Sequence, residues 1–360
     1  MEAVFFLIAV LFLAYLGDEK KMGKKAVIFR VLLILVLSFL PWVSGELSTD
    51  HAGYADDYKS IGRMSNLGIE SVGDFLFGRM TEGEYGFVVL CRLLNKIGIS
   101  TSGFFLVIAI LTNTFLVKSY YRFNFPVFTF FLLLCSAHYL IQSNLVRQIL
   151  AVSIVLFNLK YAVEKDWKTY LLICVIAFTI HHSSIVSLLF LPFCFFDGGY
   201  QYMKWLFAGL WIISVLIAFG VVFLDLTQLN LLAGATEGYD FYLNSENGIG
   251  TSNESFGYVY NFLIILLFLF YKGEGRNIIY AYVFVLGAVF SNLSVAIPNL
   301  FRVSLYFSAT YPFFVPYILS NMMSNRKLRL PIQGLTVIIV LYYIRTYFLL
   351  MSSADYFSVL

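Results

Sequence analysis

Long apolar segments, separated by short polar stretches, recur along the whole chain. Of its 360 residues, 60% are hydrophobic and only 12% are charged, unlike the balance in a water-soluble domain. A helix needs about 20 mainly apolar residues to cross a hydrocarbon core about 30 Å thick. The sequence therefore predicts an all-α, polytopic integral membrane protein, with residues 1–360 as one transmembrane domain. About twelve spans are predicted, at 3–16, 26–44, 103–118, 126–141, 148–163, 169–181, 183–196, 205–224, 257–271, 277–296, 303–320 and 330–350.

Lysine and arginine residues gather in alternate loops between these spans. Cytoplasmic loops of membrane proteins carry an excess of these residues, so we expect the basic loops to face the cytoplasm. Two longer loops, 45–85 and 225–256, are rich in acids, and the second has no lysine or arginine. We therefore predict that both are external loops. The basic residues behind this orientation are Lys20, Lys21, Lys24, Lys25, Lys118, Arg122, Lys165, Lys168, Lys204, Lys272, Arg276, Arg326, Lys327 and Arg329.

One apolar segment, residues 86–98, does not fit the alternation. It is short and contains Arg92 and Lys96. If it crossed the membrane, every later basic loop would change sides. Twelve residues of α-helix rise only about 18 Å, less than the hydrocarbon core. We therefore predict a re-entrant or interfacial helix here, on the outer face.

This topology places several polar residues on the same side of the membrane. Arg147 opens the span 148–163, and His181-His182 form the tight turn after the span 169–181. Arg302 opens the span 303–320, and Arg345 lies near the outer end of the last span. The acids Asp56-Asp57 lie in the first external loop. We expect these elements to converge on the outer face.

The residue types in this set suit chemistry on a phosphate. Arginine presents a planar set of N–H donors matched to phosphate oxygens, and a helix N-terminus adds partial positive charge. Arg147 and Arg302 could thus stabilise a departing diphosphate, while His181 or the acids Asp56 and Asp57 could take up a proton. The predicted catalytic residues are Arg147, His181, Arg302 and Asp57. The predicted substrate-binding residues are Asp56, His182, Gln148, Asn144, Arg92, Arg345 and Tyr58, with no metal site and no cofactor expected.

Each of these residues also has a simpler explanation. Arg147 could anchor the helix at the lipid head groups, as could Arg92 together with Lys96. The polar neighbours of Arg147, Gln142 to Asn144 and Gln148, favour a function instead. Asp56 and Asp57 could simply solubilise a loop. If His181 and His182 follow helical spacing, their side chains diverge by about 100°, so we expect only one of them to face the site.

Two stretches of the chain resemble a known family. Leu145 to Ile154, then Ala177 to Ile185 with its His181-His182-Ser183-Ser184, resemble the central signature of the EpsG family, an Arg-Gln pair followed by a span ending in His-x-Ser. Spacing after Ala177 favours His181 over His182 as the family histidine. Tyr54 to Tyr58, and later Glu84-Tyr85-Gly86-Phe87, resemble the family's first external loop and its acidic Glu-Pro-x-Phe element. Here Gly86 stands in place of the proline.

The resemblance implies a polymerase of the kind related to the Wzy polymerases of O-antigen, capsule or exopolysaccharide. Such an enzyme transfers a growing glycan from undecaprenyl diphosphate to the non-reducing end of a new lipid-linked unit, at the outer face of the bacterial inner membrane. The resemblance also implies a glycosyltransferase of GT-C-like architecture that needs no metal and inverts the anomeric centre. The implied partners are undecaprenyl-diphosphate-linked oligosaccharides and membrane lipids, with a chain-length regulator and a flippase as candidate proteins and no nucleic acid.

Three other functions share some of these features. A ligase that moves finished glycan to another acceptor would use the same arginines at the same membrane face. A polysaccharide flippase or transporter would more often carry charges or broken helices at the bilayer midplane, where this sequence has few. An acyltransferase would need donor access from the cytoplasmic side, opposite to the side predicted for His181.

Overall fold

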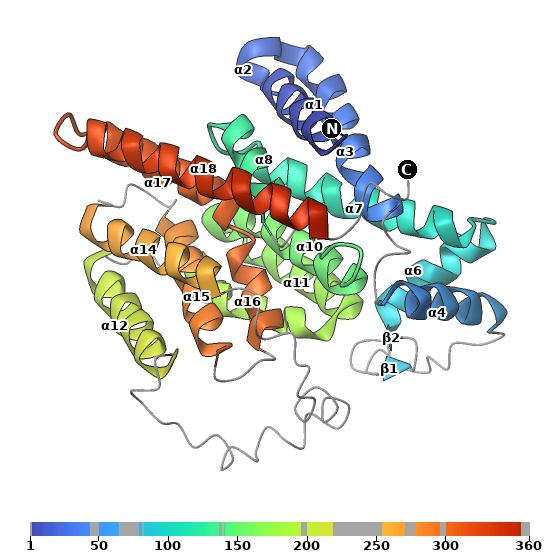
Figure 1. Ribbon diagram of the computed structural model, residues 1–360. Coiled ribbons are helices and arrows are strands. Elements are labelled where there is room, and N and C mark those ends of the chain that lie inside the picture. The colour runs from blue at the N-terminus through green and yellow to red at the C-terminus, as the bar shows by residue number, and fades with distance from the viewer. Residues whose placement is uncertain are drawn as a thin grey trace. The chain divides into compact units, whose positions relative to one another are not determined.

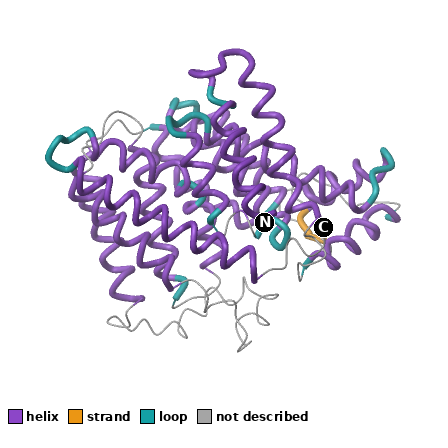
Figure 2. The backbone as a smooth tube through the Cα atoms, turned by 45° about the horizontal axis from the view of Figure 1, so that its top comes forward, coloured by secondary structure: helices purple, strands orange, loops and turns teal. Residues whose placement is uncertain are grey.

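The structure of the protein is a computed structural model. Most of the residues that it describes lie in helices (Figure 1). The described residues are 2–43, 50–64, 79–80, 83–136, 139, 141–195, 200–218, 254–270, 278–295 and 300–353. Most of them lie in helices joined by short loops (Figure 2). The predicted external loop 225–256 lies outside the described residues, except for its end, where α14 begins at Glu254.

The chain forms two compact units. The first comprises Met1–Phe195 and Tyr311–Leu360, and the second Phe196–Thr310. The elements of the first unit are α1 (Glu2–Leu16), α2 (Glu19–Met22), η1 (Gly23–Lys25), α3 (Ala26–Val43), α4 (His51–Arg63), β1 (Arg79–Met80), β2 (Gly83–Glu84), α6 (Tyr85–Lys96), α7 (Thr101–Tyr120), α8 (Pro126–Leu134), α10 (Val146–Val163), α11 (Trp167–Ile180), η3 (His182–Cys194), α17 (Tyr311–Met323) and α18 (Arg329–Ser353). Those of the second are α12 (Tyr200–Ala218), α14 (Glu254–Phe270), α15 (Ile278–Leu293) and α16 (Leu300–Ser308).

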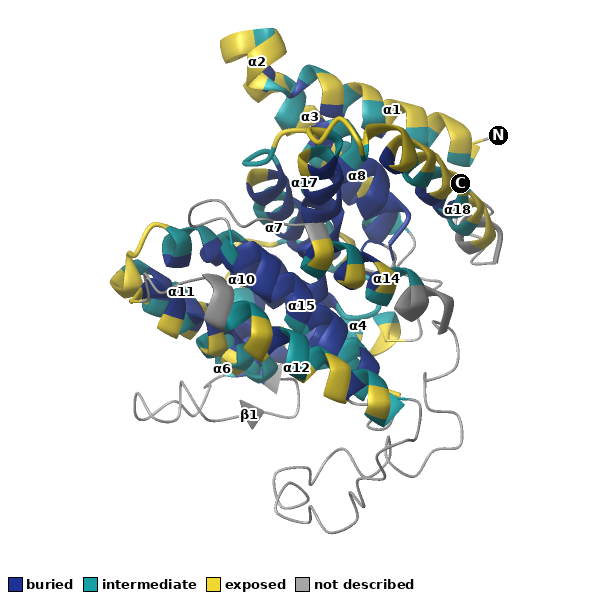
Figure 3. Cartoon of the chain, turned by 90° about the vertical axis from the view of Figure 1, so that its left-hand side faces the viewer, coloured by how far each residue is buried: buried dark blue, intermediate teal, exposed yellow. Residues whose placement is uncertain are grey.

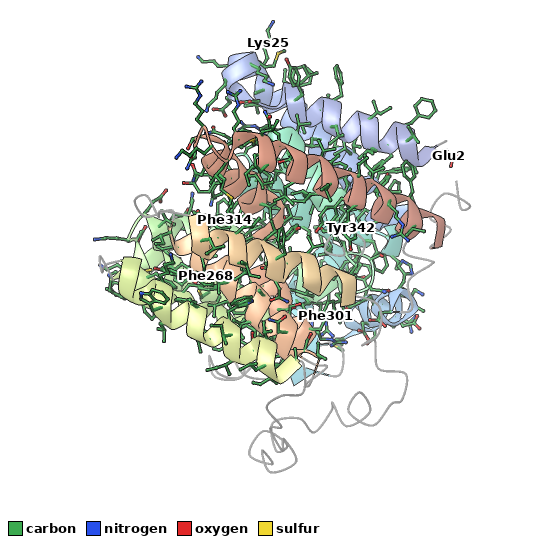
Figure 4. The ribbon with its side chains drawn as sticks, turned by 60° about the vertical axis from the view of Figure 1, so that its left-hand side comes forward. Glu2, Lys25, Phe268, Phe301, Phe314 and Tyr342 are labelled. Carbon is green, nitrogen blue, oxygen red and sulfur yellow. The ribbon has the colours of Figure 1, made fainter. Side chains whose placement is uncertain are left out.

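The first two long helices, α1 and α3, form a hairpin with its basic residues at one end. Glu2 and Lys25 mark the two ends of this hairpin in Figure 4. Apolar side chains such as Phe5 and Phe12 are exposed on its surface, as expected where a helix faces lipid instead of water. Helix α18 likewise exposes Leu330, Ile338 and Leu341.

Helix α10 lies at the centre of the first unit. It packs against α7, α11 and η3, and most of its residues are buried (Figure 3). Helix α15 has the same place in the second unit, between α12, α14 and α16. A chain of amide and hydroxyl contacts ties α15 to two of these neighbours, with Asn292 bonded to Asn261 and to Ser214.

The fold is that of an α-helical membrane protein. Four helices are long and apolar enough to cross a membrane alone, within Glu19–Val43, Thr101–Tyr120, Val146–Val163 and Arg329–Leu349, and six shorter apolar helices accompany them in the described part of the chain. The predicted separate helix at 86–98 is present as α6, and the predicted external loop 45–85 contains the helix α4.

Three predicted spans differ in form from a single α-helix. The span 126–141 is wrong as one helix, because α8 ends at Leu134. Ser136 closes this end by donating both its N–H and its hydroxyl to the carbonyl of Leu133, three residues earlier.

The span 303–320 is wrong as one helix, because α16 ends at Ser308 and α17 begins at Tyr311. Pro312 explains the break, because it has no N–H to donate to the carbonyl of Ser308, four residues earlier, and its ring would clash with that carbonyl. The span 183–196 is the 3₁₀-helix η3, 13 residues long. At about 2.0 Å per residue, a 3₁₀-helix of this length extends further than an α-helix would.

Candidate functional site

A buried carboxylate, Glu84, joins three parts of the first unit that lie far apart in the sequence. Glu84 ends the short strand β2, which pairs with β1, and is the N-cap residue of α6. Helix α6 packs against α4 on one side and α11 on another, and Figure 1 shows α4, α6 and β2 together. The Glu84 side chain reaches towards α10 and the end of α11, and the residue is only 2% exposed.

Both oxygens of this carboxylate accept hydrogen bonds. Oε1 lies 3.0 Å from Nδ1 of His181 and accepts the backbone N–H of His182 at 3.2 Å. Oε2 accepts from Nη1 of Arg147 at 3.1 Å, which makes an ion pair. Buried charges need such partners, because an unpaired carboxylate would be costly away from water.

The chain conformation at the end of α11 explains how both histidines reach one carboxylate. Helix α11 ends at Ile180, and His181 has an extended backbone with φ −156° and ψ 116°. The helical spacing on which the sequence argument relied therefore does not apply here. The ring of His181 faces Glu84, whereas His182 contributes its backbone N–H and stacks its ring on Phe178 with centroids 4.6 Å apart.

Arg147 lies in the first turn of α10, between Glu84 and two aromatic rings. Its guanidinium carbon is 5.5 Å from the ring centroid of Tyr54 and 5.6 Å from that of Phe87. These distances suit cation–π contacts, which strengthen where water is excluded. The side chain is only 16% exposed. Arg147 is therefore held within the protein, and the snorkelling anchor considered from the sequence does not describe this geometry.

Close packing of Gly86 on Thr179 brings the two sides of the site together. A Cβ atom added to Gly86 would lie 2.3 Å from Oγ1 of Thr179 and 2.6 Å from its carbonyl oxygen. Only a residue without a side chain allows the start of α6 to approach α11 this closely. Glu84 is two residues before this contact, and His181 is two residues after it.

Electrostatics keep Glu84 ionised. Burial by itself would raise its pKa, but the hydrogen bond and charge of His181, together with the charge of Arg147, lower the pKa to about 2. An ionised carboxylate only accepts hydrogen bonds, so Nδ1 of His181 must be the donor. In the neutral ring the other nitrogen, Nε2, then carries the lone pair that can take up a proton.

The structure brings four of the predicted site residues together. These are Arg147, His181, His182 and Asp57; Asp57 lies on α4, where its charge acts on Arg147. Asp56, on the same helix, is exposed and pairs with Lys59 at 3.4 Å. Tyr58 is buried by packing, with its hydroxyl donating to the carbonyl of Ile99 (2.8 Å) and its ring stacked on Phe104.

The other predicted residues belong to α6, α10, α16 and α18 and to the turn before α10. Gln148 is buried in α10 beside Arg147, and Asn144 belongs to the turn before that helix. Arg92 is half-buried on α6, and Arg345 is exposed on α18. Arg302 is half-buried on α16, in the second unit.

Glu84 is the residue that the prediction of site residues missed. The sequence signal for Glu84 is the resemblance of Glu84-Tyr85-Gly86-Phe87 to the acidic element of the family, although Glu84 is also one of several acids in the predicted external loop 45–85. Among the described residues, no group of three or more histidine, cysteine, aspartate or glutamate side chains is arranged to hold a metal ion.

Fold and site together define an α-helical membrane protein with a buried Glu–His–Arg cluster at the start of a central helix. The model of the EpsG family matches residues 27–360. The chain therefore belongs to the EpsG family, a family of Wzy-type polymerases, as its sequence motifs indicated. The comparison with curated proteins found no match, and the comparison with solved structures found none either.

Proposed function

We propose that this protein polymerises oligosaccharide repeat units carried on undecaprenyl diphosphate, for O-antigen, capsule or exopolysaccharide. It transfers the growing glycan from its lipid carrier to the non-reducing end of a new lipid-linked unit. The observation that carries the proposal is the Glu84 carboxylate, which holds a candidate base, His181, and a candidate phosphate ligand, Arg147, in one cluster. Membership of the EpsG family supports the same substrate class.

The transfer is a direct displacement at the anomeric carbon of the growing glycan. A hydroxyl oxygen of the acceptor sugar forms the new bond to this carbon as its bond to the diphosphate oxygen breaks. The electron pair of the broken bond leaves with the lipid diphosphate, and the hydroxyl proton passes to Nε2 of His181. The proton then returns to water. A single displacement of this kind inverts the anomeric centre.

Arg147 supplies positive charge where the leaving diphosphate gains negative charge. A guanidinium offers five N–H donors in one plane, so an arginine can contact a carboxylate and a phosphate at the same time. Arg302 is a second phosphate-binding candidate, and its part in the proposal rests on the sequence alone. The sequence is also the only basis for the substrate contacts proposed for Asp56, Asn144, Gln148, Arg92, Arg345 and Tyr58.

The finer features of the proposal come from the sequence and the family. The alternation of basic loops supports a site on the outer, periplasmic side of a bacterial inner membrane. Independence from metal is proposed because arginine can take the place of a divalent cation beside a diphosphate. The proposed architecture has about twelve spans and is GT-C-like.

The test is the glycan made by cells whose only copy of this protein carries Arg147→Ala or Arg147→Lys. We expect Arg147→Ala to abolish the ladder of long glycans on a gel and to leave single repeat units. Arg147→Lys keeps the charge without the planar donors, so a weakened ladder is expected. The control is Arg326→Ala, an exposed arginine in the loop before α18, which should leave the ladder unchanged.

The carrier and the membrane side on which glycan accumulates separate the alternatives. Long glycans that accumulate on the lipid carrier would indicate a ligase, and repeat units confined to the cytoplasmic side would indicate a flippase. A normal ladder from well-expressed Arg147→Ala would overturn the proposed role of the arginine.

A further inference from the structure

Glu84 contacts Arg147, His181 and His182 through its two carboxylate oxygens, and nothing in the transfer just described requires it to touch substrate. It is almost fully buried and uses both oxygens, one for the two histidine residues and one for Arg147. As the N-cap residue of α6, it could have capped its own helix, yet its side chain reaches across to α10 and α11. This arrangement suits a residue that positions others.

We infer that Glu84 is a positioning residue for glycan transfer: it fixes the orientation and tautomer of His181, so that Nε2 is the atom that takes the acceptor proton. This inference rests on the proposed function. The Nδ1 contact at 3.0 Å sets the plane and direction of the ring. The N–H of His182 and Nη1 of Arg147 hold the carboxylate itself in place from two other segments.

The chemistry follows from the donor and acceptor roles of the two groups. A carboxylate accepts only, so the ring must place its proton on Nδ1. The neutral ring then has its lone pair on Nε2, and the imidazolium formed by proton uptake lies directly against a negative charge. In serine proteases a buried aspartate does the same for the catalytic histidine, and its amide replacement gives the wrong tautomer.

Several charged or titratable groups surround this pair. Arg147 faces Glu84 from α10, and Tyr54 and Asp57 face Arg147 from α4. Cys91 lies on α6 within the electrostatic reach of Arg147 and Asp57, and His182 follows on η3. Because Arg147 and Glu84 balance each other, proton uptake by His181 changes the charge of this group by one unit.

The experiment measures initial rates of glycan polymerisation against pH. Membranes that contain the full chain are supplied with lipid-linked repeat units extracted from cells lacking this protein. The variants are Glu84→Gln, which keeps the shape but can donate to Nδ1, and Glu84→Asp, which keeps the charge with shorter reach. Glu164→Gln, an exposed acid at the end of α10, is the matched control.

We expect Glu84→Gln to lower the rate by about 10²- to 10⁴-fold, the range that a general base contributes. The acid limb of its residual activity should move to lower pH, because the imidazolium has lost its carboxylate. Glu84→Asp should fall between Glu84→Gln and the unchanged protein, and Glu164→Gln should match the latter. A purely structural role would lower the amount of folded protein without moving the pH profile.

Different results would contradict the proposed function and the positioning role of Glu84. If the unchanged protein makes no polymer from these units, the proposed function is wrong. If it does, and Glu84→Gln keeps the same rate and pH profile, only the positioning role fails. Should Glu84→Gln not fold, a full rate from Glu84→Asp would overturn the inference, since the contact geometry would then be irrelevant.

Discussion

Substitution of Gly86 by alanine should disable the site without touching any of its polar groups. The added Cβ would meet Oγ1, Cβ and the carbonyl oxygen of Thr179 at 2.3, 2.5 and 2.6 Å. To reach ordinary van der Waals contact, the start of α6 must move from α11 by about 1 Å, which a close-packed interior resists. The side chain of Thr179 can rotate, but its carbonyl oxygen cannot leave the helix.

The size of the effect follows from this displacement. Glu84 and His181 lie on the two sides of the Gly86–Thr179 contact, with Oε1 and Nδ1 3.0 Å apart. A shift of about 1 Å takes this pair beyond hydrogen-bonding distance. Overpacking costs about 1–3 kcal/mol, and loss of a hydrogen bond to a charged group costs about 1.5–3 kcal/mol. We therefore expect a destabilisation of about 3–5 kcal/mol and a loss of most of the polymer.

The assay pairs thermal unfolding in detergent with the glycan ladder. Gly53→Ala is the matched control, because Gly53 lies in α4 and a Cβ there would meet nothing within 4 Å. That change should be neutral or slightly stabilising. A second substitution, Thr179→Gly, removes two of the three contacts and should restore part of the activity of Gly86→Ala. If Gly86→Ala unfolds and polymerises like the unchanged protein, the close approach of α6 and α11 does not hold the site together.

Two further predictions concern stability. Because the pKa of Glu84 is lowered from 4.5 to about 2, its carboxylate stabilises the fold above pH 4.5, and this contribution should be lost as the pH falls towards 2. The whole contribution is about 3 kcal/mol, of which about 2 kcal/mol should be lost between pH 6 and pH 3. Thermal unfolding at these two pH values should show this loss in the unchanged protein but much less in Glu84→Gln; equal acid sensitivity of both would refute it. In the second unit, Asn292→Leu breaks the contacts with Asn261 and Ser214, and unfolding should show a cost of about 1–2 kcal/mol. Asn321→Leu, at an exposed position on α17, is the control, and an equal effect of both would argue against a role for the polar network.

The helices could be predicted from the sequence because burial inside the protein and contact with lipid both require long runs of apolar residues. The predicted span at 148–163 and the observed helix Val146–Val163 differ by only two residues at the start. An apolar run does not show whether its backbone is one α-helix, a 3₁₀-helix or two helices with a break between them. The break before Pro312 and the 3₁₀ form of η3 depend on local hydrogen bonding, which hydrophobicity does not record.

The site could be predicted in part for a similar reason. Arg147 and His181 stand out because each is a polar residue beside an apolar run. Glu84 does not, because it follows a polar stretch rich in acids. Its partners are 63 and 97 residues away in the sequence, so only the packing of α6 against α11 reveals the cluster.

The presence of Glu84 changes how Arg147 can act on a diphosphate. From the sequence, Arg147 is a cation that acts with Arg302 and has no assigned counter-ion, so it would attract phosphate in every state. In the structure its charge is balanced by a carboxylate 3.1 Å away. On the proposed mechanism, the hydroxyl proton reaches His181 at the same time as the leaving diphosphate gains a negative charge. The cluster thus becomes positive when the bond breaks, and not before. An enzyme accelerates a reaction only through interactions that are stronger in the transition state than in the bound substrate. A balanced Glu–Arg pair beside a proton-accepting histidine meets that condition better than a free arginine, because its positive charge develops as the bond breaks.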